Sequence, residues 1–370
     1  MKFCYLSNTK PTQSYTFMKI LKYLLFLILL IFIGTAIYFG TKESSYEIKD
    51  ALIIQAPPQV VFNKVNNLKS WDQWKVWKQK EPNIVFNHAE QNSGEGASFS
   101  WDAKQSGSVI TTKVIPNKEI HQDVAVKTGR GEVNSKMDWQ FDEVDGNTYV
   151  SFILKGEHSL FDKVYYSISG TDFNTDLHLI KQAILRDISK EVVEDMKRYS
   201  IHVDGVTQYG GGYYMYVTSA AKQDQVRERM GSMMGEVRRF ISRNNLSDAG
   251  NPFLLFNEIN PSNNTVIFST CFPVREKVIT PQSSPVLCDF MEPVTAVKTS
   301  LKGNYNHFAE AYDEARKYMD KNGYQQDPQQ KVFEVYVTNP DSVVNPAEWL
   351  TEIYIPIIST PEPVLEFNDI

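Results

Sequence analysis

Two segments near the C-terminus place an acidic side chain two residues before a tyrosine. The pairs are Glu334 with Tyr336 and Glu352 with Tyr354, and both stand in aliphatic and aromatic runs that are typical of strands. Successive side chains of a strand point to opposite faces, so each pair shares one face and leaves an aliphatic face to pack against helices. The pattern therefore predicts two carboxylate–ring pairs in one sheet.

A carboxylate beside aromatic rings suits an apolar organic cation. The charge attracts the cation, and a ring adds a cation–π contribution of about 0.5–2 kcal/mol. A partly buried carboxylate also resists being left unpaired, which discriminates against neutral ligands. The alternative is a solvent-facing strand with ordinary polar residues. The candidate ligand-binding residues are Glu334, Tyr336, Glu352 and Tyr354, with the aromatic residues Tyr305, Trp349, Tyr214 and Tyr216 as further walls.

Other chemistries find little support in the sequence. The six histidines are scattered and form no pair at a ligand spacing, so neither a metal nor a cofactor is predicted. Gly210-Gly211-Gly212 lacks the Lys-Ser/Thr of a phosphate loop and predicts a bulge or a close backbone approach. An enzyme, if this is one, would use Glu334 on a water or an electrophile. The net charge of −6, without a Lys/Arg cluster, argues against nucleic-acid binding.

The candidate residues belong to an internal repeat in the second half of the chain. Each unit predicts a strand, a helix and two further strands, and two such units predict one antiparallel sheet with a groove at their junction. The helices carry apolar stripes at spacings of three and four, which indicate core. The predicted strands are 208–218, 253–258 and 265–274 in the first unit and 293–300, 332–338 and 350–357 in the second, with helices at 222–243 and 304–321.

The first half predicts a separate α+β unit. A strand over 46–56 ends at Pro57-Pro58, and a short helix follows with Val61, Phe62, Val65 and Leu68 on one face. A long helix closes the unit over about 172–197. Turn signals separate the strands between the two helices. These strands are predicted at 83–87, 97–101, 109–115, 120–126, 137–141 and 149–155.

This order resembles the START-like (polyketide cyclase and lipid-transport) superfamily over roughly residues 46–198. The residues that carry the resemblance are Ala56-Pro57-Pro58 with the apolar residues after it, the patch of Trp71, Trp74 and Trp77, and the terminal helix. The resemblance implies a helix-grip fold whose centre is either a hydrophobic cavity for an apolar ligand or a packed core.

The second half is similar to the GyrI-like family, also described as the effector-binding domain of AraC- and MerR-type transcription activators. The similarity rests on Gly303-Asn304-Tyr305, Asn322-Gly323-Tyr324, Phe333-Glu334-Val335-Tyr336 and the run from Thr351 to Ile357. It implies an aromatic-lined pocket for amphipathic, often cationic compounds with an acid at its base, and Glu334 matches that acid. One branch of the family hydrolyses reactive small molecules. No helix-turn-helix domain precedes this half, so transcription activation is not implied.

The stretch from Tyr23 to Thr41 has no charged residue and is apolar almost throughout. About 20 helical residues span the hydrocarbon core of a bilayer, so this run predicts a transmembrane helix. The lysines before it have no acid among them, and the charges after it are mixed, which favours a cytoplasmic N-terminus. These lysines are Lys2, Lys10, Lys19 and Lys22.

Several alternatives stay open at this point. The apolar run is also compatible with a cleaved signal peptide, with Gly34-Thr35-Ala36 as the small-residue site, or with a buried core helix. Met18 is an alternative first residue. Cys4 is expected on the cytoplasmic side, whereas Cys271 and Cys288 are expected outside, where they form either a disulfide or two buried thiols.

The sequence therefore predicts an α+β protein with an N-terminal transmembrane helix, a START-like helix-grip domain and a GyrI-like domain of two strand-helix-strand-strand repeats. The predicted segments are a tail at 1–18, the membrane helix at 19–41 and domains at 46–198 and 206–360. We expect a single-pass protein of the cytoplasmic membrane that binds an apolar organic ligand, either cationic or neutral, in the pocket of its GyrI-like domain on the extracytoplasmic side. The alternatives are a hydrolase that uses Glu334 and an adaptor for a protein partner. The sequence leaves the ligand's identity and the oligomeric state open.

Overall fold

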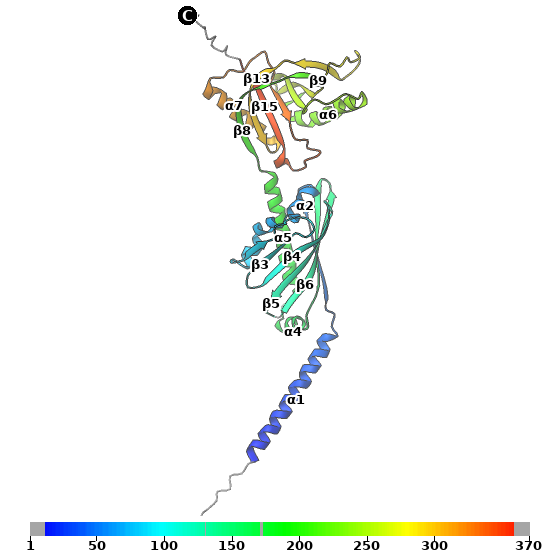
Figure 1. The fold of residues 1–370 in the computed structure, drawn as a ribbon, viewed down its shortest axis with the longest axis vertical. Coiled ribbons are helices and arrows are strands. Elements are labelled where there is room, and N and C mark those ends of the chain that lie inside the picture. The colour runs from blue at the N-terminus through cyan, green and yellow to red at the C-terminus, as the bar shows by residue number, and fades with distance from the viewer. Residues whose placement is uncertain (1–11, 130, 171–172, 359–370) are drawn as a thin grey trace, which may run out of the picture. The chain divides into compact units, whose positions relative to one another are not determined.

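The computed structural model describes residues 12–129, 131–170 and 173–358, and the chain divides into two compact units at Val192/Val193 (Figure 1). Lys2, Cys4, Lys10 and the last two residues of the predicted C-terminal domain, 359–360, lie outside the described residues.

Helix α1 (Thr12–Gly40) contains the predicted membrane segment except Thr41. Its part from Met18 to Gly40 is long and apolar enough to cross a bilayer, and its apolar side chains are exposed along most of that length. The exposure excludes the buried core helix that the sequence left open.

The first unit is a seven-stranded antiparallel sheet with helices packed against it. The order of the strands across the sheet is β1-β7-β6-β5-β4-β3-β2, so β1, the first strand in the chain, pairs with β7, the last strand of this unit. They are β1 (Ser45–Ile54), β2 (Val85–His88), β3 (Ser98–Asp102), β4 (Ser106–Ile115), β5 (Glu119–Thr128), β6 (Gly131–Val144) and β7 (Asn147–Glu157). All seven lie close to the predicted positions, because alternating apolar residues and turn residues mark each of them.

The helices of this unit are α2 (Pro58–Asn66), a 3-10 turn (Leu68–Gln73), α3 (Lys75–Lys80), α4 (Leu160–Ser169) and α5 (Phe173–Met196). The tryptophan patch forms part of the core: Trp71 and Trp74 are buried and stack at 4.5 Å between ring centroids. Ile184, Leu185 and Ile188 of α5 are buried too. A sheet that curls around one long helix is the helix-grip arrangement. Helices α3 and α4 and the 3-10 turn had no counterpart in the sequence prediction.

The second unit is an eight-stranded antiparallel sheet in the order β12-β9-β11-β10-β14-β15-β13-β8. Its strands are β8 (Ser200–Tyr209), β9 (Gly212–Lys222), β10 (Phe253–Asn260), β11 (Thr265–Pro273), β12 (Leu287–Met291), β13 (Val294–Lys302), β14 (Phe333–Tyr336) and β15 (Leu350–Pro356). Helix α6 (Val226–Arg243) follows β9, and α7 (Phe308–Asn322) follows β13. The two predicted repeats are therefore present, and they meet where β10 pairs with β14.

The strand predicted across the triple glycine is wrong. The chain turns at Gly210 and Gly211, so that β8 pairs with β13 at one edge while β9 pairs with β11 and β12 near the other. At Gly211 φ is +68°, and a Cβ there would lie 2.1 Å from the carbonyl oxygen of Met291. Only glycine fits such an approach, which confirms the close-contact interpretation of this motif.

The disulfide is also excluded. Cys271 on β11 and Cys288 on β12 are free thiols, and β9 runs between their strands, with Tyr216 opposite Cys271 and Met215 opposite Cys288. Neighbouring strands are about 4.8 Å apart, so two strands on either side of a third place their cysteines too far apart to bond.

Candidate functional site

Glu334 lies at the centre of the second unit. It stands on β14, the strand that joins the second repeat to the first, and its side chain is completely buried. A carboxylate without access to water must find its partners within the protein. The residues around Glu334 therefore define the site.

The two carboxylate–ring pairs lie on opposite faces of the sheet, which corrects the expectation from strand alternation. Tyr336 packs in the core under α6 and α7, whereas Tyr354 packs in the cluster on the other face. The cause is the register: Glu334 pairs with Ile353, and Glu352 pairs with Val335. Side chains of paired residues share a face, so the two glutamates cannot line one pocket.

Four hydrogen bonds satisfy the Glu334 carboxylate. Its Oε2 accepts from Arg227 Nη1 at 2.5 Å and from the Tyr336 hydroxyl at 2.7 Å. Its Oε1 accepts from Arg227 Nη2 at 2.8 Å and from the Tyr312 hydroxyl at 2.9 Å. A bidentate guanidinium–carboxylate pair is among the strongest charge-assisted contacts. Burial raises the pKa of both tyrosine hydroxyls well above the usual value, so both remain donors.

Aromatic rings surround the guanidinium of Arg227. Its central carbon lies 4.0 Å from the ring centroid of Phe308 and 5.9 Å from those of Tyr305 and Tyr336. Burial is the largest single influence on Arg227 and lowers its pKa, but the charge and hydrogen bond of Glu334 together with Tyr336 and Tyr312 raise the pKa above its usual value. The Arg227 side chain is still 28% exposed. The site is thus a cation held by one acid and several rings, with an opening to solvent on the arginine side.

The predicted wall residues divide between the two faces. Tyr305 contacts both Tyr336 and Trp349, with ring centroids 5.6 and 4.7 Å apart, so these three rings belong to the Glu334 site. Burial raises the pKa of Tyr305 to about 12, although the Arg227 charge opposes this rise. Tyr214 and Tyr216 lie on the opposite face beside each other, and the Tyr214 hydroxyl donates to Asp289 at 3.3 Å.

Glu352 forms a second, more open cluster on that opposite face. Its Oε1 lies 2.7 Å from Lys298 Nζ, and its Oε2 accepts from the Tyr354 hydroxyl at 2.8 Å. Burial is the main cause that raises the pKa of Tyr354, followed by its hydrogen bond to Glu352. The Glu352 side chain is 20% exposed and that of Lys298 25%. Both partners of this ion pair therefore reach solvent, where such pairs contribute little to stability.

Sequence reasoning missed Arg227 and Tyr312. The sequence does contain a signal for Arg227. It precedes Met230 by three residues and Met234 by seven, so it lies on the same face of the helix as this apolar stripe. A charge in such a stripe requires a buried partner. Tyr312 lies in the apolar stripe of the second predicted helix, which indicates core, and its hydroxyl gives no sequence signal.

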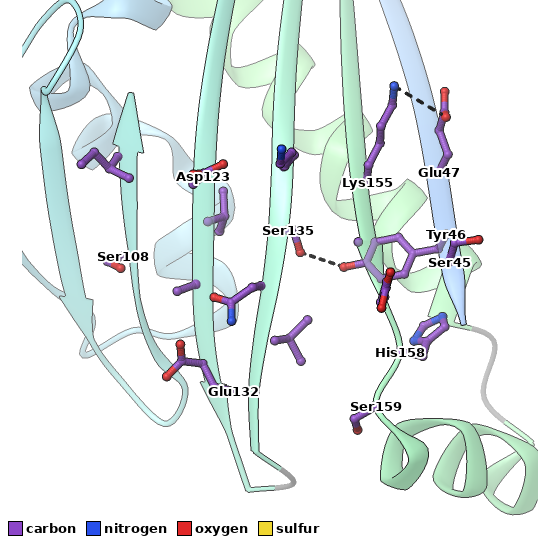
Figure 2. Close-up of a pocket in the computed structure, with 18 of the residues that line it drawn as sticks. Ser45, Tyr46, Glu47, Ser108, Asp123, Glu132, Ser135, Lys155, His158 and Ser159 are labelled. Atoms are coloured by element: carbon purple, nitrogen blue, oxygen red, sulfur yellow. Dashed lines mark hydrogen bonds and ion pairs between the residues drawn. The ribbon is translucent and has the colours of Figure 1, made fainter. Parts of the chain in front are cut away.

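Two hollows of the first unit lie against its sheet. An apolar cavity of about 270 Å³ lies among the tryptophans, with Phe99, Trp139 and Lys181 also in its lining. A shallow polar groove of about 1120 Å³ follows the strands from β4 to β1 (Figure 2). In the groove the Tyr46 hydroxyl lies 2.7 Å from Ser135 Oγ, and Lys155 pairs with Glu47 at 3.7 Å. The cavity is consistent with the hollow that the START-like resemblance allowed.

The residues that the structure describes contain no group of three or more His, Cys, Asp or Glu side chains that could hold a metal ion.

Comparison with known proteins identifies part of the chain. Residues 223–358 match the family described as the GyrI-like small molecule binding domain. No curated protein matches the chain.

Solved structures resemble the chain at low identity. The crystal structure of the EcmrR C-terminal domain is 16% identical with a TM-score of 0.38, covering 44% of this chain and 99% of that one. A cryo-EM structure of an EcmrR–DNA complex is 15% identical with a TM-score of 0.36, covering 55% and 78%. The solution structure of the Aha1 dimer from Colwellia psychrerythraea is 17% identical with a TM-score of 0.28, covering 39% and 96%.

Proposed function

Residues 223–358 belong to the GyrI-like small-molecule-binding family; from this premise we propose that the domain binds an apolar organic cation, with Glu334 as the counter-ion. The observation that carries the proposal is the guanidinium that already occupies the site. A flat, delocalised cation lies against Glu334 and the ring of Phe308. The site is therefore complementary in charge and shape to a group of this kind.

Arg227 stands where the cationic group of a ligand would bind. The two cannot share Glu334, because the arginine already uses both carboxylate oxygens. Arg227 is the second residue of α6, and its side chain is partly exposed, so it can turn out to solvent without unfolding the sheet. Binding thus requires displacement of Arg227, and the cost of displacement lowers the apparent affinity for the ligand.

The test uses benzylguanidinium, a flat cation on an apolar ring, and benzylurea as a neutral compound of similar size and shape. Isothermal titration of the full chain in detergent is expected to show binding of the guanidinium and not of the urea. Arg227→Gln is expected to tighten cation binding about tenfold or more, because the competitor is gone. Glu334→Gln is expected to abolish it. Arg238→Gln, on the same helix but away from the site, is the matched control.

The proposal fails if Arg227→Gln is folded by circular dichroism and binds the cation no better than the original chain. It also fails if Glu334→Gln retains the affinity. Capture of a discrete protein partner without any small-molecule binding would instead support the adaptor interpretation.

A hydrolase that uses Glu334 has weaker geometric support. Each oxygen of the carboxylate accepts two hydrogen bonds, so neither is free to activate a water or attack an electrophile. The same bonds are compatible with a binding role, in which a ligand replaces the arginine. Binding is therefore the function that this site favours.

We also propose that α1 anchors the protein in the cytoplasmic membrane, with both domains on the extracytoplasmic side. The segment from Met18 to Gly40 has 23 residues, about 35 Å of helix, which exceeds the ~30 Å hydrocarbon core. Its exposed leucines, isoleucines and phenylalanines would otherwise face water. Resistance to carbonate extraction would support the anchor, and protease accessibility of the domains in spheroplasts would support their location. Release into the soluble fraction would refute the first claim, and full protection from protease the second.

A further inference from the structure

Helix α4 (Leu160–Ser169) is a well-defined helix that joins the sheet of the first unit to α5. Ser159 caps its first turn: Ser159 Oγ accepts from the Asp162 backbone N–H at 3.1 Å and donates to the Asp162 carboxylate at 2.7 Å. Gly170 ends it in the left-handed conformation. Caps at both ends fix the helix, so the face that it presents is a defined feature of the surface.

That face is apolar and exposed. Ile168 is 79% exposed and Phe161 67%, and Tyr165 between them is also exposed. The spacing of four and three residues places the three on one side of the helix. They line a hollow together with Val164 and Gly129, which lies at the turn between β5 and β6. Large apolar side chains that gather on a surface helix mark an interaction site.

The position of α4 indicates what covers this face. Lys163 Nζ donates to the carbonyl oxygens of Phe39 at 3.2 Å and Lys42 at 2.6 Å, which tie α4 to the C-terminal end of α1. Tyr38 is exposed there, and Lys42 lies 4.6 Å from its ring centroid. An exposed tyrosine and a lysine at the end of an apolar helix are typical of the membrane–water interface. If α1 spans the bilayer as proposed, α4 lies at the level where α1 leaves the hydrocarbon core.

We infer that α4 is a second membrane contact, whose face of Phe161, Tyr165 and Ile168 inserts among the lipid headgroups beside α1. The inference rests on the proposed anchoring by α1 and extends it. An amphipathic helix in the interfacial plane buries its apolar face at the headgroup–acyl boundary, while polar groups remain on the other side. Here the other side carries Asp162, which is buried, and Lys163, which binds α1. The contact would hold the helix-grip domain in one orientation at the bilayer.

The test measures the depth of spin labels on the full chain in vesicles of phosphatidylcholine and phosphatidylglycerol. Labels are placed one at a time by Phe161→Cys and Ile168→Cys after Cys4, Cys271 and Cys288 are replaced by alanine. Ile28→Cys in α1 reports the anchor. Val85→Cys is the matched control, because Val85 is apolar and 57% exposed on β2, at the opposite edge of the same sheet from β1.

Collision rates with oxygen, which dissolves in lipid, and with a water-soluble nickel chelate give the depth. The labels at 161 and 168 are expected to collide several-fold less with nickel than the label at 85, and more with oxygen. If label 28 is in lipid but label 168 is as accessible to nickel as label 85, the contact by α4 is refuted and the anchor stands. If labels 28 and 168 both collide freely with nickel, both proposals fail. Protection of label 168 from both reagents would mean that protein covers the face, and would also overturn the inference.

Discussion

The ion pair between Arg227 and Glu334 should dominate the local stability of the GyrI-like domain. Removing Arg227 and removing Glu334 should not cost the same free energy of unfolding. Glu334 has no exposed surface, whereas 28% of the Arg227 side chain reaches solvent. Arg227→Met therefore leaves a buried anion with only two tyrosine donors. We expect this variant to lose about 3–5 kcal/mol, the usual cost of breaking a buried pair from one side.

Glu334→Gln is expected to cost less, about 1–3 kcal/mol. The glutamine keeps the shape of the side chain, and the unpaired arginine can turn toward water, so the loss is close to that of hydrogen bonds left unmade. The double variant should lose less stability than the sum of the losses of the two single variants, and the difference, which is the coupling energy between the two residues, should be about 1–3 kcal/mol. Arg238→Met removes a partly exposed pair with Asp341 at 3.8 Å and should cost no more than about 1 kcal/mol.

The assay is hydrogen exchange of the β14 amides, read by mass spectrometry on the full chain in detergent. Exchange reports the opening free energy of this strand even when the other unit unfolds separately. The reasoning is refuted if Arg227→Met changes β14 protection no more than Arg238→Met does. It is also refuted if the double variant shows simple additivity, because the two side chains would then not depend on each other.

Three further predictions test other parts of the structure. Gly211→Ala should destabilise the second unit by about 1–3 kcal/mol, because φ at this residue is +68° and backbone atoms block the added Cβ. Gly210→Ala should be nearly neutral, because no atom lies within 4 Å of a Cβ added there. Thermal unfolding of the two variants compares these effects. Burial lowers the pKa of Lys181 to about 8, so between about pH 8 and 10.5 the unfolded chain binds more protons than the folded chain. The free energy of unfolding, measured with urea, should therefore rise by on the order of 2 kcal/mol over that pH range. Lys181→Met should not show this rise. Dithiothreitol should not alter the melting temperature, and non-reducing mass spectrometry after alkylation of the unfolded chain should find Cys271 and Cys288 both modified; an unmodified, disulfide-linked pair would contradict the strand order.

Much of the architecture follows from the sequence alone. The uncharged run before Thr41 has the length and composition of a membrane span, the alternating segments of the first half became β2 to β7, and the repeat of the second half became one sheet. These features depend on local periodicity, which a sequence displays directly. The motif that contains Glu334 was found in the same way, and so was its place on a strand, whereas the complete burial of that strand was not predicted.

Only the tertiary structure decided which face of the sheet each glutamate occupies and what it binds. Alternation fixes which side chains of one strand share a face, but the register between β14 and β15 fixes which face that is, and it separates Glu334 from Glu352. The partner of Glu334 is 107 residues away in the chain, on the first turn of α6. Such a pair arises from the packing of two repeats against each other. The order of the strands in the sheet likewise places Cys271 and Cys288 on either side of β9, which keeps them apart. Local pattern identifies an acid that must be paired, whereas the packing of the whole sheet selects the arginine.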